Sequence, residues 1–151
     1  MAKWVVGSGL DDYLKQLAAL EKDSTTVIKR SVYEGAKVVA EEFESQIDAI
    51  PATLVSDVQR QGLHDGLGLA KMRDDSGFIN TKIGFDGYNK DNRYKTAIRW
   101  KANAAVARRV CAGTSHQPAY DFVRKAINAS KTKAENAMKE QLDQEITKRT
   151  K

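Results

Sequence analysis

Residues 106–127 read Val106-Ala-Arg-Arg-Val-Cys-Ala-Gly113-Thr-Ser-His-Gln-Pro118-Ala-Tyr-Asp-Phe122-Val-Arg-Lys-Ala-Ile127, which predicts an ordered segment, a tight loop and the start of a helix. Gly113 can adopt backbone angles that other residues avoid, and Thr114 can hydrogen-bond to the nearby backbone. Pro118 fits the first turn of a helix, where its missing N–H is not needed. We expect Asp121 in the same turn, because the positive end of the helix dipole favours a carboxylate there.

The loop should lead directly into a buried helical stripe. Apolar residues follow it at helical spacing, namely Phe122, Val123, Ala126 and Ile127, and then Ala134, Met138, Leu142 and Ile146. We therefore expect a long final helix that starts at Pro118 and ends in a frayed basic tail at about residues 147–151.

Two N-terminal helices are expected, one of them long. A short helix should open at Gly7-Ser8-Gly9 and break at Lys22-Asp23-Ser24, and Ser24 or Thr25 can cap the second. The second helix should stop at Pro51, and its apolar residues recur three or four apart: Ile28, Val32, Ala36, Val39, Phe43, Ile47 and Ile50. This stripe can lie across a sheet, or part of it can meet a neighbouring subunit, as heptad-like repeats do.

Strand patterns occupy the middle of the chain. Residues 67–73 and 78–85 flank the turn-forming cluster Asp74-Asp75-Ser76-Gly77 and predict a β-hairpin. After a polar loop at residues 87–92, alternation from Tyr94 to Lys101 predicts a third strand. Residues 104–110 stay open between strand and short helix, and residues 52–61 carry no clear pattern.

Together these patterns predict one α+β domain over residues 1–151. We expect two N-terminal helices, a small mostly antiparallel sheet with a β-hairpin, and a long C-terminal helix packed with the second helix on the sheet. The chain has 151 residues, 41% hydrophobic and 30% charged, which suits a single core. No run approaches the roughly 20 apolar residues of a membrane helix, and no signal peptide is evident, so we expect a cytoplasmic protein without a membrane partner.

The loop and helix start resemble a known signature. The order Gly113-Thr114-Ser115, Gln117-Pro118, Phe122-Val123-Arg124 and Ala126 resembles the C-terminal signature of the neck or tail-completion (minor tail component) family of long-tailed, siphovirus-type phages. Members read Gly-Thr-Ser, a few polar residues, Pro-Phe-Leu/Met/Val-Arg-Pro-Ala and a long helix. Asp121 and Lys125 stand here where prolines are usual, and Cys111 and Ala112 replace an acidic residue often found before Gly-Thr. Residues 62–67 are loosely similar to the family's entry into its hairpin, and the family's usual strand before Gly-Thr argues for a strand at residues 104–110.

The resemblance implies a structural virion protein. It would be a head-tail connector or tail component, repeated as a homo-oligomeric ring that joins head to tail around the DNA channel. Its partners would be neighbouring phage connector and tail proteins, and it would occupy the host cytoplasm during assembly and then the virion. The free state (monomer or ring), the copy number and the choice between neck and tail terminator stay open. The residues expected to hold the loop-helix corner are Gly113, Thr114, Pro118, Phe122 and Arg124.

A basic segment is the second candidate site. The chain carries a net charge of +5, but residues 1–50 have a net charge of −3 and the rest +8. Between residues 90 and 109 the candidates for contact with neighbouring subunits or DNA are Arg93, Lys95, Arg99, Lys101, Arg108 and Arg109, with Tyr88, Tyr94 and Trp100 interleaved. Such cations can meet phosphates or a protein surface, or can lie on a solvated strand. The alternative function is therefore a small basic nucleic-acid-binding protein without sequence specificity.

No constellation of catalytic residues is evident. His64 and His116 lack a nucleophile motif, no glycine loop suits a phosphate, and the single cysteine, Cys111, has no metal-site spacing. We expect no enzymatic activity, no cofactor and no metal.

Overall fold

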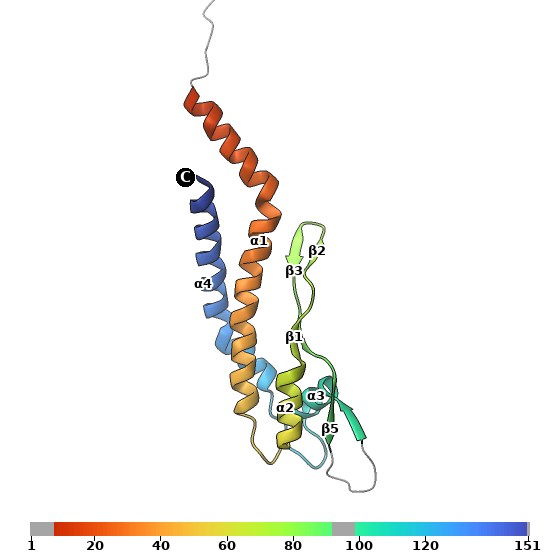
Figure 1. Cartoon of the computed structure of the whole chain (residues 1–151). Helices are drawn as coiled ribbons and strands as arrows, with labels where there is room; N and C mark the ends of the chain where they lie inside the picture. Colours follow the sequence, from red (N-terminus) through yellow and green to blue (C-terminus); the bar gives the residue numbers. More distant parts are fainter. Residues whose placement is uncertain (1–7, 92–98, 151) are drawn as a thin grey trace, which may run out of the picture.

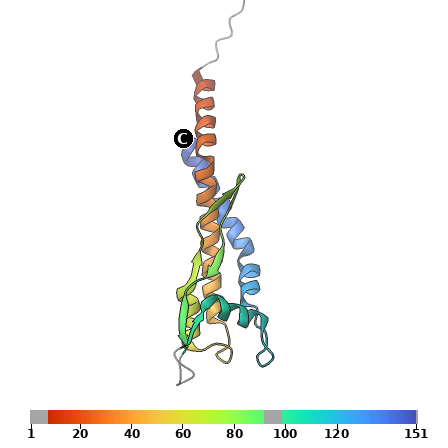
Figure 2. The ribbon, with the colours of Figure 1, turned by 90° about the vertical axis from the view of Figure 1, so that its right-hand side faces the viewer.

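The computed structural model describes residues 8–91 and 99–150. Two long helices, α1 (Ser8–Asp48) and α4 (Phe122–Thr150), run side by side in opposite directions and form an elongated stem (Figure 1, Figure 2). At about 1.5 Å per residue, α1 is about 60 Å long. Smaller elements gather around the lower end of the stem, and the expected α+β fold class, with its long helices and β-hairpin, is confirmed.

The expected break at residues 22–24 is wrong, because α1 passes through it as one helix. Ser24 does not cap a new helix: its hydroxyl donates to the carbonyl of Glu21, one turn earlier, at 2.9 Å. Lys, Asp and Ser cost only a few tenths of a kcal/mol each inside a helix. The end of α4 also pairs with this segment, since Arg149 lies 3.3 Å from Asp23. The helix ends at Asp48, close to Pro51 as expected.

The apolar stripe of α1 is buried at its C-terminal half. Phe43, Ile47 and Ile50 are at most 5% exposed, as expected, whereas Ile28 is 41% exposed and its neighbour Val27 is buried instead. α1 packs mainly against α4, and to a lesser extent against strands. The two helices approach closely: the hydroxyl of Ser31 donates to the carbonyl of Met138 at 2.8 Å.

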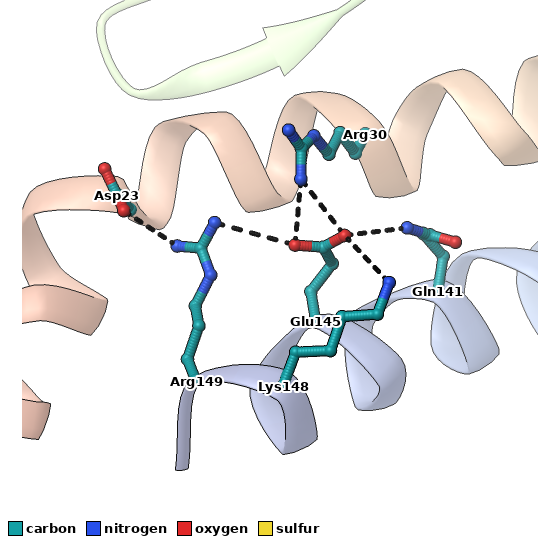
Figure 3. Close-up of polar contacts among 6 residues, drawn as sticks. All are labelled: Asp23, Arg30, Gln141, Glu145, Lys148 and Arg149. Atoms are coloured by element: carbon teal, nitrogen blue, oxygen red, sulfur yellow. Dashed lines mark hydrogen bonds and ion pairs between the residues drawn. The ribbon is translucent and has the colours of Figure 1, made fainter. Parts of the chain in front are cut away.

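A buried carboxylate near the C-terminal end of α4 joins the two helices. Glu145 on α4 is 4% exposed, and both of its oxygens accept from Arg30 on α1, at 3.1 and 3.2 Å (Figure 3). Lys148 and Arg149 pair with the same carboxylate at 3.9 and 3.5 Å, and Gln141 donates to it at 3.3 Å. Residues 147–150, expected as a frayed tail, are helical. Arg149 pairs with Asp23 of α1, whereas Lys148 pairs with Glu145 within α4.

Two short helices connect the stem to the strands. α2 (Asp57–Gly66) begins with a capping box in which Ser56 and Gln59 bond to each other's backbone N–H. That Ser-x-x-Gln pattern lies within residues 52–61, where no apolar periodicity predicts a helix. α3 (Asn103–Ala112) decides the open question at residues 104–110 in favour of a helix, so the strand that the family resemblance argued for there is wrong.

The predicted hairpin is confirmed. β1 (Leu67–Leu69) pairs with β4 (Ile83–Phe85), and further out β2 (Arg73–Asp75) pairs with β3 (Phe78–Asn80). The turn at Ser76 and Gly77 has positive φ at both residues, +58° and +90°, as tight hairpin turns require. The hairpin lies alongside α1 with its tip pointing up the stem (Figure 2).

A second antiparallel pair forms from β5 (Tyr88–Asp91) and β6 (Arg99–Ala102). The polar loop expected at residues 87–92 is wrong, because β5 occupies most of it. Only the end of the expected third strand is described, as β6, since residues 92–98 lie outside the described residues. Asn89 and Asn103 are buried and bonded to each other at 2.9 Å. A buried amide pair of this kind gives no apolar signal, which explains why β5 was missed.

The main core lies where α1, α2, α3, the base of the hairpin and the start of α4 meet. It consists of Phe43, Ile47, Ile50, Leu54, Val55, Leu63, Val106, Ala107, Val110, Phe122 and Ala126.

Candidate functional site

The loop between α3 and α4 is a tightly closed turn. Gly113 has φ +73° and ψ −177°, a combination that essentially only glycine adopts. Thr114 and Gln117 exchange backbone hydrogen bonds of 2.8 and 3.3 Å, and the Thr114 hydroxyl accepts from the N–H of His116 at 3.3 Å. Gly113 and Thr114 therefore shape the corner.

Side chains of this loop dock onto the segment that connects α1 to α2. Gln117 donates from Nε2 to the carbonyl of Leu54 at 2.8 Å, and the hydroxyl of Tyr120 donates to the carbonyl of Ala49 at 3.2 Å. The backbone N–H of Tyr120 also donates to Val110 of α3 at 2.8 Å. The corner thus joins the α1–α2 segment, α3 and α4. Nothing in the sequence pattern marks Gln117 or Tyr120 as docking residues, since polar loop residues without periodicity carry no docking signal.

The start of α4 differs from our expectation. The helix begins at Phe122, not at Pro118, and Asp121 precedes it as its cap: Asp121 Oδ1 accepts from the backbone N–H of Arg124 at 3.0 Å. Phe122 is fully buried, and its ring lies 5.9 Å from that of Phe85, edge to face. Pro118 is exposed, and the side chain of Arg124 is 78% exposed. Of the five corner residues, Thr114, Pro118 and Arg124 are therefore exposed.

Two arginine side chains bond to carbonyls at the end of α1 and in the segment that connects α1 to α2. Arg60 of α2 donates to the carbonyls of Ile47, Asp48 and Ile50, which lie at and just after the C-terminal end of α1. Arg109 of α3 donates to the carbonyl of Leu54 at 3.1 Å and to Gln59 Oε1 at 3.0 Å. Nothing in the sequence marks Arg60 as a cap, because its acceptors precede it by 10 to 13 residues across a loop.

The basic segment is only partly described. Arg93 and Lys95 lie outside the described residues, and so does the side chain of Arg99 on β6. Lys101 is half-buried on β6, and Arg108 is exposed on α3. Arg109, its neighbour, bonds within the chain, so the consecutive arginines face different surroundings.

A shallow apolar groove lies beside the corner, and we call it the hairpin-base groove. It measures about 330 Å³, and its lining residues are Phe43, Ile83, Gly84, Phe85, Ala107, Arg108, Cys111, Asp121 and Val123. The ring of Phe85 lies 6.2 Å from that of Phe43, which gives the groove an aromatic wall. Burial raises the pKa of the Cys111 thiol, and the nearby Asp121 carboxylate adds to the shift.

The histidines do not come together. His64 Nε2 lies 2.8 Å from Asp48 Oδ1 at the end of α1, and His116 is exposed on the corner loop. Among the residues that the structure describes, no three His, Cys, Asp or Glu side chains gather as a metal site would require. In the same part of the chain, no helix has the length and apolar character to cross a membrane.

The groove and the corner thus share α3 and the start of α4, and the groove also includes the hairpin base and Phe43 of α1. Comparisons of the chain with protein-family models, with curated proteins and with solved structures found no match.

Proposed function

We propose that this chain is a structural subunit of a phage particle, a neck or tail-completion protein that forms a ring between head and tail. The observation that carries the proposal is the corner at residues 113–126, whose sequence resembles the signature of that family. Its glycine has backbone angles that other residues avoid, its threonine closes the turn, and its phenylalanine is fully buried. Gly113, Thr114 and Phe122 therefore each have a physical role in one local structure, which a chance match of the sequence to the signature would not require.

The rest of the molecule is compatible with an assembly role. Large apolar side chains stand on the surface, with Phe78 72% and Tyr88 68% exposed. Exposed aromatics of this kind are frequent anchors at protein interfaces. Arg108 adds an exposed cation beside the apolar groove.

The experiment is electron microscopy of lysates from the parent phage with this gene interrupted by an early stop codon. We expect filled heads beside unattached tails, and joined particles once a wild-type copy is supplied. Normal, infectious virions from the interrupted gene would overturn the proposal.

The basic segment supports a second candidate, a nucleic-acid-binding protein without sequence specificity. Such a protein binds duplex DNA as a free subunit, and its affinity falls by orders of magnitude between low and physiological salt. Fluorescence anisotropy with a labelled duplex tests this candidate directly. Tight, salt-dependent binding by the free chain would favour it over the ring subunit.

A further inference from the structure

The tip of the hairpin presents an aromatic side chain to solvent. Phe78, directly after the turn, is the most exposed of the large apolar side chains that the structure describes, at 72%. The turn is held in shape by its own acids: Asp74 Oδ1 accepts from the N–H of Gly77, and Asp75 Oδ2 from Asn80 Nδ2, both at 2.8 Å. The tip is thus a preorganised aromatic knob beside two exposed carboxylates.

The hairpin-base groove has the complementary character. Its aromatic wall suits a phenyl ring, because aromatic pairs gain stability from edge and offset contacts beyond the area that they bury. At the rim of the groove, the Asp121 carboxylate forms an ion pair with Arg124 at 3.7 Å. The second charged residue of the rim, Arg108, is exposed. The hairpin tip, with Phe78 beside two acidic residues, therefore complements the groove in both apolar character and charge.

One chain cannot bring the two features together. Phe78 and Ile83 lie on the same arm of the hairpin, five residues apart, on strands β3 and β4, near its tip and at its base. At about 3.3 Å per residue, five residues of extended chain span about 16 Å. The tip that fills a groove must therefore come from another copy.

We propose that Phe78 of one copy inserts into the hairpin-base groove of a second copy, with Asp74 and Asp75 facing Arg108. Different surfaces meet in such a contact, so repetition builds a ring when the rotation closes and a filament when it does not. The inference rests on the proposed function in one respect, that the chain works as a ring of identical copies. It names the contact that joins them.

The single cysteine makes the contact testable by cross-linking. Cys111 lines the groove, so the full chain with Phe78→Cys should form a disulfide between copies under mild catalysed oxidation. Phe78 is largely exposed, so this change should leave folding intact. We expect a ladder of covalent oligomers on non-reducing gels. The double variant with Phe78→Cys and Cys111→Ser should form covalent dimers at most, without larger oligomers.

A matched control uses Tyr88→Cys, since Tyr88 is an aromatic of nearly equal exposure on another strand. It should give at least about tenfold less cross-linking than Phe78→Cys, and Arg108→Glu in the Phe78→Cys chain should lower the yield by a similar factor through like-charge repulsion. Equal yields from the Phe78→Cys and Tyr88→Cys chains would overturn the contact. Dimers closed by two disulfides, without larger species, would also overturn it.

The same variant in particles separates this inference from the proposed function. If the chain is present at the head-tail junction but neither the particles nor the concentrated purified chain gives the ladder, the docking contact is wrong and the ring role stands. If the chain is absent from particles, the proposed function fails, and a ladder from the purified chain would still establish the contact between copies.

Discussion

A Cβ atom at Gly113 would lie 2.7 Å from the backbone nitrogen of Ala119, closer than Cβ atoms normally approach. Gly113→Ala should therefore lower the free energy of unfolding by about 2–3 kcal/mol, through backbone strain and this clash. Urea denaturation of the two chains measures the difference. Gly84→Ala is the control, because a Cβ there meets nothing within 4 Å, and its stability should stay within about 0.5 kcal/mol of the wild type. A Gly113→Ala chain as stable as the control would show that the corner can rearrange.

The consecutive arginines of α3 should differ in their effect on stability. Arg109→Met removes donors from the carbonyl of Leu54 and from Gln59, and should cost about 1.5–3 kcal/mol, the usual range for hydrogen bonds from a charged group. Arg108→Met changes an exposed side chain and should cost less than about 0.5 kcal/mol. Thermal unfolding of both variants makes the comparison, and equal losses would contradict it.

Glu145 should be the most sensitive charged position of the stem. Glu145→Gln keeps the size but leaves Arg149, whose side chain is only 20% exposed, without one of its two carboxylates. We expect a loss of about 1–3 kcal/mol, below the range for a fully buried pair because Arg30 and Lys148 are largely exposed. Glu140→Gln, on the exposed side of the same helix, is the matched control and should be nearly neutral. If urea titration finds the two variants equally stable, the buried carboxylate does not stabilise the pairing of α1 with α4.

Cys111 should react slowly with alkylating reagents in the folded chain. Burial raises its pKa, so at a given pH a smaller fraction is thiolate, the form that reacts. The rate of alkylation by iodoacetamide should rise with pH through a midpoint higher than that of the same chain unfolded in urea. Restricted access alone would lower the rate at every pH without moving the midpoint, so an unshifted midpoint would contradict the prediction.

Much of the fold could be predicted because it depends on local patterns. The hairpin follows from turn-forming residues between alternating strands, and the long C-terminal helix follows from apolar residues repeated along its length. The errors arose where a local signal was weak and a distant contact outweighed it. The break expected at residues 22–24 is absent, and the paired Arg149 of α4 lies 126 residues away from Asp23 along the chain.

The candidate site could likewise be predicted only in part. The sequence alone determined that Gly113, Thr114 and Phe122 belong to a turn that enters a helix, because backbone angles and apolar spacing are properties of neighbouring residues. Only the tertiary structure decided that Arg109 bonds inside the chain while Arg108 faces solvent. It also decided that the base of the hairpin, α3 and the start of α4 form one groove. Those facts depend on which carbonyls and rings the folded chain brings together, and distance along a sequence does not encode distance in space.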